Sequence, residues 1–389
     1  MIRNTVFVTD GFWRKSLAAV RALANSGLKT GVGERTPLAS ALFSKYASWR
    51  HIYPSRDLYP DRFLSWLEKL AKTGKYDALI VPEEETCLLI ARNKERFARF
   101  IRIPLPEYDV MNFSRNKFSL VSRAIDLGVP SPNTKLISSI TDIYDYENCW
   151  KFPLVLKPVN GSGGHGIQYV YNKERLETIC EDTLNKFGKL LLQDYIPGNE
   201  SYGVSVLFNE RNEMRSAFVH KKLRQYPSTG GASTYAVSVK YPKLVEISEV
   251  LLKSLRWYGA ANVEFKIDQR DNIPKLMEVN PRLWGSLQLA ISSGVNIPYM
   301  LYNLALKGDI KPVFDYKTGI KFRWFLHGDA MHFLSNLYKI KKSDPNIFKL
   351  YEKGNCHAVW SLRDPLPMLG NILSLLDFLA SREMKKYRG

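Results

Sequence analysis

The first hundred residues alternate between short apolar runs and longer stretches with helical periodicity. TVFVTD precedes Gly11, apolar residues recur at helical spacing over about 16–24, Gly27 follows as a helix stop, and KTGVGE comes next. The same order returns in FLSWLEKLAKT, the strand-like YDALIVP and LLIARNKERF. Strands and helices in alternation are typical of a parallel sheet with covering helices. The pattern therefore predicts a small α/β domain at the start of the chain.

A different pattern begins beyond this domain. Ser114 is predicted to cap a helix through NKFSLVSRAIDLG. From about 152 to 308, strand-like runs such as FPLVLKP, YGVSVLF and ANVEFKI alternate with helical ones such as LVEISEVLLKSLRWY. Several antiparallel strands with packed helices indicate an α+β body. The remaining stretch is basic and has no clear pattern until its last helix.

Size and cysteine usage set limits on this outline. With 389 residues, of which 45% are hydrophobic, the chain is long enough for two or more packed units. Four widely spaced cysteines without a CxxC pair argue against a disulfide framework and a structural zinc site. No run approaches the ~20 apolar residues of a membrane-spanning helix, and the N-terminal apolar stretch is too short for a secretory signal. These features predict a cytoplasmic protein.

The formal net charge of +18 attracts phosphates, acidic substrates, nucleic acid or anionic lipid. No motif of interleaved aromatic and basic residues is present in the sequence, so we predict no specific nucleic-acid partner. The stretch MLGNILSLLDFLA, followed by SREMKKYRG, is an apolar helix with a basic end. Two interpretations stay open: the helix packs on its own domain, or it makes peripheral contact with an anionic membrane.

The most informative chemistry lies in NVEFKIDQRDNIPKLMEVNPR. Glu264 and Glu278 fall on two strand-like runs separated by DQRDN, which has turn composition. If the strands form a hairpin centred near Asp271, the two carboxylates face one another. A hard divalent cation such as Mg²⁺ would neutralise them, and Asn280 offers a further oxygen on the same face. The alternative is a solvated sheet face on which both glutamates pair with neighbouring basic residues.

A glycine-rich loop follows the strand-like run that ends at Lys157. Glycine lets backbone amides approach phosphate oxygens, and a lysine at the strand end suits a phosphate. No GK[ST] follows, so this is not a Walker loop, and the N-terminal domain lacks the GxGxxG of dinucleotide sites. A plain flexible hairpin is the alternative interpretation. The candidate residues are Gly161, Ser162, Gly163, Gly164 and Gly166.

Two further groups of charged residues have open interpretations. Glu83, Glu84 and Glu85 follow a predicted strand, where ligands of α/β proteins bind, but carboxylates also favour a helix start. In FVHKKLR, alternation places His220, Lys222 and Arg224 on one strand face. That face would bind a phosphate or a substrate carboxylate, unless it is a solvated basic strand.

Five motifs occur in an order that resembles the ATP-grasp superfamily, in its carboxylate-amine ligase and carbamoyl-phosphate-synthase-like branch. They are Asn116-Lys117, FPLVLKP with its glycine loop, LLQDYIPGNE, STGGAST, and VEF followed by LMEVNPRLWGS. The resemblance covers about residues 1–308. It implies a pre-ATP-grasp-like α/β domain (1–108), an ATP-grasp body of two subdomains (109–190 and 191–308) with the nucleotide between them, and a C-terminal extension (309–389).

The resemblance also implies roles for individual residues. Lys117 and Lys157 would contact the ATP phosphates beneath the loop from Gly161 to Gly166. The catalytic residues would be Arg282 and Lys222, although an arginine is frequent at position 222 in relatives. Asp194 likewise stands where many relatives carry Glu. The residues that would hold adenine and ribose are Gln193, Asp194, Tyr195, Ile196 and Glu200, and those that would hold one or two Mg²⁺ ions, or Mn²⁺ in their place, are Glu264, Glu278 and Asn280.

The activity that the resemblance implies is an ATP- and Mg²⁺-dependent ligase. Such an enzyme converts a small-molecule carboxylate into an acyl phosphate and transfers the acyl group to an amine. Two alternatives stay open: an enzyme that phosphorylates bicarbonate, like carbamoyl phosphate synthase or biotin carboxylase, and a nucleotide-binding sensor without turnover. A homodimer is a further hypothesis.

Overall fold

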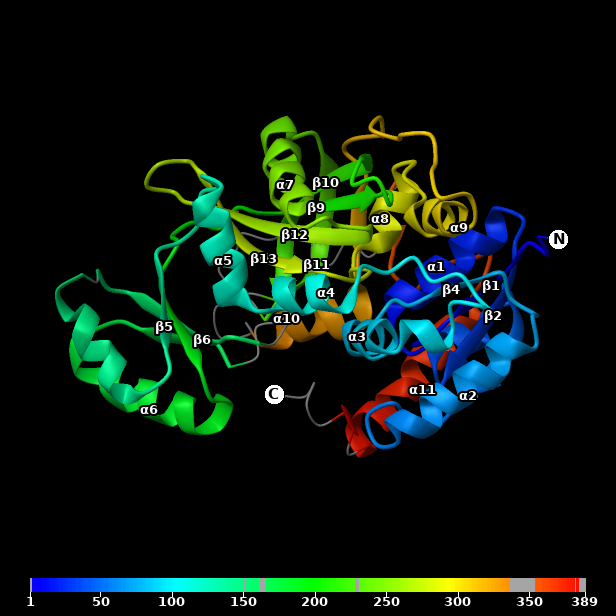
Figure 1. Cartoon of the computed structure of the whole chain (residues 1–389), viewed down its shortest axis with the longest axis horizontal. Coiled ribbons are helices and arrows are strands. Elements are labelled where there is room, and N and C mark those ends of the chain that lie inside the picture. The colour runs from blue at the N-terminus through cyan, green and yellow to red at the C-terminus, as the bar shows by residue number, and fades with distance from the viewer. Residues whose placement is uncertain are drawn as a thin grey trace.

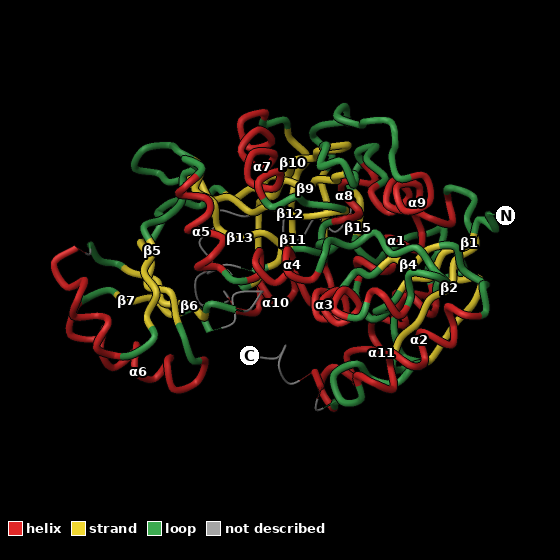
Figure 2. The backbone as a smooth tube through the Cα atoms, viewed as in Figure 1, coloured by secondary structure: helices red, strands yellow, loops and turns green. Residues whose placement is uncertain are grey.

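The computed structural model describes residues 2–149, 151–160, 166–227, 231–335, 354–381 and 383–384. The strands of these residues form three sheets, of four, seven and four strands. In Figure 1 the first sheet lies at one end of the molecule, the seven-stranded sheet lies in the middle, and the last sheet forms a lobe at the other end. Figure 2 shows the same strands as separate groups joined by loops and flanked by helices.

The N-terminal sheet is parallel and has the strand order β3-β2-β1-β4. Every residue of β1 is buried, as expected for a parallel strand covered on both faces. The predicted N-terminal α/β domain is therefore confirmed. Its strands are β1 (Thr5–Val8), β2 (Lys29–Glu34), β3 (Ala47–Ile52) and β4 (Ala78–Ile80). Its helices are α1 (Arg14–Asn25), α2 (Pro60–Lys72) and α3 (Glu84–Arg92), with the short turns η1 (Ser40–Phe43) and η2 (Lys94–Arg96).

Two helices, α4 (Tyr108–Arg115) and α5 (Lys117–Asp126), lead from this unit into the body. The predicted helix start at Ser114 is wrong, because Ser114 lies inside α4 and donates its hydroxyl to the Met111 carbonyl at 2.8 Å. Asn116 has an extended backbone between the helices and caps α5 by accepting from the Ser119 N–H at 3.0 Å. Lys117 is therefore the first residue of α5.

The smaller lobe contains an antiparallel sheet with the order β5-β8-β6-β7. Its small core consists mainly of apolar strand residues packed against α6. The Lys117 N–H donates to the Val159 carbonyl at 3.1 Å, which ties α5 to the end of β6. The strands are β5 (Thr134–Ile137), β6 (Leu154–Pro158), β7 (Gln168–Val170) and β8 (Leu190–Asp194); the helices are α6 (Leu176–Phe187) and the turns η3 (Ile140–Cys149) and η4 (Lys173–Arg175).

The central sheet has the order β13-β12-β9-β10-β11-β14-β15 and is antiparallel except for its last pair. One face packs against α7 and the buried Trp257, and the other packs against α8, α9 and α1 of the N-terminal unit. This confirms the predicted α+β body. The elements are β9 (Ser201–Phe208), β10 (Met214–Tyr226), β11 (Ala232–Val239), β12 (Gly259–Ile267), β13 (Pro274–Asn280), α7 (Pro242–Ser254), α8 (Leu287–Ser292) and α9 (Ile297–Lys307).

The described residues beyond 309 join both of the larger units. The strands β14 (Lys321–Arg323) and β15 (Cys356–His357) extend the central sheet, and the turn η5 (Phe325–Asp329) and helix α10 (Ala330–Ser335) follow β14. The last helix, α11 (Leu366–Ala380), packs against η1 of the N-terminal unit, and Arg21 forms an ion pair of 2.9 Å with Asp364 just before it. The four domain boundaries given above stay predictions.

The length and hydropathy of the helices decide whether any of them could span a membrane. None of the helices in the described part of the chain is both long and apolar enough to cross a membrane. The cytoplasmic setting stays a prediction.

Candidate active site

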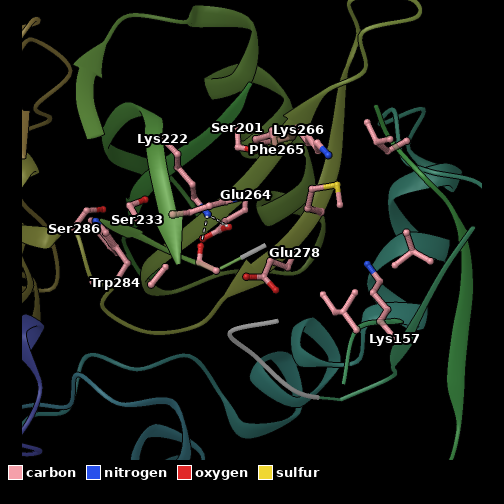
Figure 3. Close-up of a pocket in the computed structure, with 18 of the residues that line it drawn as sticks. Lys157, Ser201, Lys222, Ser233, Glu264, Phe265, Lys266, Glu278, Trp284 and Ser286 are labelled. Atoms are coloured by element: carbon pink, nitrogen blue, oxygen red, sulfur yellow. Dashed lines mark hydrogen bonds and ion pairs between the residues drawn. The ribbon is translucent and has the colours of Figure 1, made fainter. Parts of the chain in front are cut away.

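A pocket of about 860 Å³ lies where the three units meet. Lys157 reaches it from β6 of the small lobe, while Glu264 and Glu278 reach it from β12 and β13 of the central sheet. Figure 3 shows the two glutamates pointing into the same space, with Lys157 approaching from the opposite side. Trp13, Arg14 and Lys15, at the start of α1, form a further part of the wall. The pocket therefore collects side chains from segments far apart in the sequence.

The two carboxylates are direct cross-strand partners, because β12 and β13 pair Glu264 with Glu278. The predicted hairpin neighbours are thus confirmed. Lys222 Nζ lies 2.6 Å from Glu264 Oε2, and Asn280 donates to Glu278 Oε1 at 3.0 Å. Burial raises the pKa of Glu264 although Lys222 opposes the shift. Burial would also raise the pKa of Glu278, but Lys117, the bond from Asn280 and other nearby cations lower it.

These donors suit a hard cation that is shared with phosphate oxygens. Glu264 and Glu278 present carboxylate oxygens to the pocket, while the Asn280 amide oxygen accepts from Arg282 Nη2 at 3.0 Å. Among the described residues no group of three or more His, Cys, Asp or Glu side chains is placed to hold a metal. An ion here would therefore draw its remaining oxygens from a nucleotide or water, as Mg²⁺ commonly does.

Two lysines provide positive charge opposite the carboxylates. Lys117 and Lys157 both line the pocket. Burial and the neighbouring Lys117 together lower the pKa of Lys157 to about 8, although Glu278 opposes the shift. Burial also lowers the pKa of Lys117, while Glu278 and Glu84 raise it. Lys157 is buried and Lys117 is half-buried, and two such ammonium groups close together indicate a site for an anion.

The residues predicted to hold adenine and ribose divide into two sets. Gln193, Asp194, Tyr195 and Ile196 run along the end of β8 and line the pocket. Glu200 is not among the lining residues and forms an ion pair of 2.5 Å with Lys221.

In the predicted glycine loop, Gly161, Ser162, Gly163 and Gly164 lie outside the described residues, and Gly166 has a positive φ of 78°.

The acidic cluster contributes ion pairs at the edge of the pocket. Glu83 lies 2.7 Å from Lys15, and Glu84 forms an ion pair of 3.4 Å with Arg282 Nε. Burial would raise the pKa of Glu83, but Lys15, Arg282 and Arg56 lower it to about 2. Both interpretations of this cluster hold in part, since Glu84 begins α3 and Glu83 lines the pocket. The N-terminal unit thereby fixes Arg282 beside the metal-binding candidates.

The basic face of β10 is a wall of the pocket and is not a solvated strand. His220, Lys222 and Arg224 all line the pocket, and His220 and Arg224 are buried. Burial, together with Lys222, lowers the pKa of His220 to about 3, so this imidazole is neutral at pH 7. Arg224 lies 3.1 Å from Asp329, which also binds Arg323 at 2.7 Å.

Arg14 is a pocket residue that the sequence reasoning missed. Its Nε donates to the Gly285 carbonyl at 2.9 Å, and its guanidinium lies 3.5 Å from the centre of the Trp324 ring. A Cβ atom on Gly285 would lie 2.1 Å from Arg14 Nη2, so only glycine leaves room for this arrangement. Burial and the nearby Arg282 together lower the pKa of Arg14 to about 9, although Glu83 opposes the shift.

None of the ion pairs among the described residues involves Arg14, although it faces the pocket. A guanidinium fixed in this way can bind a carboxylate through two parallel hydrogen bonds. One available signal was its position directly after the first parallel strand, at the edge where ligands of α/β sheets bind. The stacking on Trp324 could not be anticipated, because it joins residues more than three hundred positions apart.

Two sequence families match the part of the chain that builds this site. The RimK-like ATP-grasp domain matches residues 114–218, and the ATP-grasp in the biosynthetic pathway with Ter operon matches residues 186–327. An uncharacterised protein of Methanocaldococcus jannaschii is 28% identical over 204 residues, 52% of this chain and 49% of that protein. The carbamoyl phosphate synthase large chain of Halomonas eurihalina is 22% identical over 194 residues, 47% of this chain and 18% of that protein. The match thus spans half or less of these relatives.

Solved structures show the same fold over most of the chain. A biotin carboxylase–βγ-ATP complex from Campylobacter jejuni has a TM-score of 0.69 at 17% identity, covering 82% of this chain and 74% of that one. An L-amino acid ligase from Bacillus licheniformis has a TM-score of 0.61 at 17% identity, covering 80% and 78%. The two overlapping matches are both to ATP-grasp domains and together span residues 114–327, so this part of the chain is an ATP-grasp unit. Within the ATP-grasp superfamily, the chain is similar to the branch of carbamoyl phosphate synthases and carboxylate-amine ligases, which confirms the resemblance seen in the sequence.

Proposed function

We propose that the protein is an ATP- and Mg²⁺-dependent ligase that joins a small-molecule carboxylate to an amine through an acyl phosphate. One observation carries the proposal: the facing carboxylates of Glu264 and Glu278 share a pocket with the buried Lys157 and the half-buried Lys117. Two neighbouring carboxylates repel each other, and so do two neighbouring ammonium groups. Both repulsions are relieved when a cation binds to the carboxylates and an anion binds to the ammonium groups. A magnesium nucleotide has this distribution of charge.

In the proposed reaction, a carboxylate oxygen of the substrate attacks the γ-phosphorus of ATP and ADP leaves. The amine nitrogen then attacks the acyl carbon, phosphate leaves, and the nitrogen loses a proton. Lys117 and Lys157 would hold the phosphates, and Gln193 to Ile196 would lie along the adenine. Glu264, Glu278 and Asn280 would hold Mg²⁺, which supplies charge neutralisation at the phosphates.

Cations at the other side of the pocket would orient the substrates. Arg282 is held by Asn280 and Glu84, so its charge is fixed close to the metal-binding candidates. Arg14 is held by Gly285 and Trp324 and lies near enough to Arg282 to influence its electrostatics. We assign the substrate carboxylate to these two guanidinium groups, because fixed cations lower the barrier without reorganising during the reaction.

The direct test is phosphate release from ATP and Mg²⁺ across a panel of amino acids, di-acids, bicarbonate and amines. We expect release only when a carboxylate and an amine are both present. Release with bicarbonate and no amine would instead support the bicarbonate-phosphorylating alternative. Nucleotide binding without release under any pairing would support the sensor and overturn the ligase.

Nucleotide affinity should depend on the protonation of Lys157. Its pKa of about 8 in the free protein means that the ammonium form is lost as pH rises through 8. Phosphate binding favours the ammonium, so we expect affinity to weaken by up to about tenfold per pH unit above pH 8. The measurement is a titration with an ATP analogue between about pH 7 and pH 9.5. Lys157→Met should bind more weakly and lose this dependence, whereas a wild-type affinity that stays flat would contradict the assignment.

A further inference from the structure

Helix α11 buries its small and polar residues and exposes its large apolar ones. The buried residues are Pro367, Gly370, Asn371 and Ser374. A second set recurs every three or four positions and therefore lies on the opposite face. This set, called the α11 face below, is exposed to solvent and consists of Leu366, Leu369, Ile372, Leu376 and Leu379. The distribution is the reverse of that in a helix that uses its leucines to pack on its own domain.

The orientation of α11 is fixed by the N-terminal unit. A Cβ atom on Gly370 would lie 2.6 Å from the Phe43 ring and 2.9 Å from the Ser40 Cα, so the helix approaches η1 closely through its glycine. Arg35 forms ion pairs with Asp377 in the helix and with Glu383 beyond it. These contacts hold the leucine side away from the protein, and Figure 1 shows α11 on the N-terminal unit, apart from the small lobe.

Acidic and basic residues are distributed unequally around the α11 face. Asp377 is bound by Arg35, and Asp364, before the helix, is bound by Arg21. Arg363 and Lys45 are exposed at the start of the helix, where the Lys45 N–H donates to Asp364 at 2.9 Å. The sequence after the helix adds Arg382, Lys385, Lys386 and Arg388. The α11 face therefore contains no charged residue, and basic residues precede and follow it in the sequence.

This charge pattern discriminates between two occupants. A second copy, paired through the α11 face about a twofold axis with antiparallel helices, would bring the basic start of one helix to the basic end of the other. Those like charges repel. An anionic bilayer attracts the basic residues at both ends and accepts the leucines between them.

We propose that the α11 face docks the protein on an anionic lipid membrane, with the leucines at the depth of the upper acyl chains and the exposed Arg363 and Lys45 at the headgroups. The helix would lie parallel to the membrane plane without crossing it. The inference rests on the exposure and charge of α11 and is independent of the ligase reaction. The active-site pocket is built from other elements, so docking leaves it intact.

The test is co-sedimentation of the full chain with vesicles of phosphatidylglycerol and phosphatidylcholine, compared with phosphatidylcholine alone. We expect binding to the anionic vesicles, weakened by salt. Leu369→Ser/Leu376→Ser should lower the vesicle affinity by about tenfold or more, because two apolar anchors are lost. Leu366→Ser/Leu379→Ser repeats the test at other positions of the same face. Ile125→Ser, at a residue 54% exposed on α5, is the matched control and should bind like wild type.

Circular dichroism measures the helix content and melting temperature of each variant, and light scattering measures its oligomeric state. The serine variants should keep the wild-type helix content and melting temperature, because the replaced side chains are exposed. A wild-type chain that stays in the supernatant with both vesicles overturns the proposal. Equal binding of the variants also overturns it, as does a wild-type dimer that the variants convert to a monomer, since a second copy would then be the occupant.

Discussion

Replacing Glu278 with Gln is expected to lower ATP-dependent phosphate release by about 10²–10³-fold. Glu278 faces Glu264 across the β12–β13 pair, and it opposes the lowering of the pKa values of Lys117 and Lys157. The amide keeps the size of the side chain but removes the anionic ligand of the proposed metal and a counter-charge for both lysines. The loss should fall on kcat, because the charge is needed most when the phosphoryl group is transferred.

A control variant and a stability measurement show whether the loss in Glu278→Gln comes from the missing charge. Glu246→Gln, on the exposed side of α7 where Glu246 pairs with Lys243, should release phosphate at the wild-type rate. The melting temperature of Glu278→Gln should stay close to that of wild type, since a glutamine can retain the hydrogen bond with Asn280. Wild-type turnover in Glu278→Gln would show that this carboxylate has no part in the reaction and would remove the main support for the proposed site.

The paired glutamates were predictable because they depend on local rules. Side chains alternate along a strand, and DQRDN has turn composition, so symmetric spacing about the turn brings Glu264 opposite Glu278. The register shifts between Glu264 and Phe265, where a bulge occurs, but the pairing of the two glutamates is retained. The parallel N-terminal sheet was predictable for the same reason, because strand and helix periods alternate clearly there.

The side of the pocket formed by Arg14 depends on tertiary contacts that no local pattern encodes. Arg14, Gly285 and Trp324 come from three distant segments, and each has an ordinary local environment in the sequence. The error at Ser114 has a local cause instead. Ser114 and Asn116 are both good caps, and the break between α4 and α5 selects Asn116. The buried face of α11 could not be inferred from composition, because the leucines are the residues that stay outside.

The C-terminal segment connects the two larger units, and this gives it a role in stability as well as in the site. The Trp324 ring stacks against Arg14, which lines the pocket, and β14 and β15 extend the central sheet. After β15 the chain returns to the N-terminal unit, where Arg21 donates to the carbonyls of Val359 and Asp364 at 2.9 Å. A change at this junction should therefore affect stability without touching the pocket.

Asp364→Ala is expected to destabilise the protein by about 3–5 kcal/mol, the usual cost of leaving a buried charge without its partner. The Asp364 side chain is 1% exposed and that of Arg21 is 9% exposed, with 2.9 Å between Arg21 Nε and Asp364 Oδ2. The same carboxylate accepts from Ser44 Oγ at 2.7 Å and from the Lys45 N–H at 2.9 Å. Removing it leaves one charged and two polar donors unsatisfied in the interior.

The measurement is the midpoint of denaturant unfolding, compared with Asp315→Ala, where the aspartate is fully exposed and little change is expected. Arg21→Met/Asp364→Leu should recover part of the loss, because it removes both charges together. An unchanged midpoint in Asp364→Ala would mean that this ion pair does not hold the C-terminal segment on the N-terminal unit.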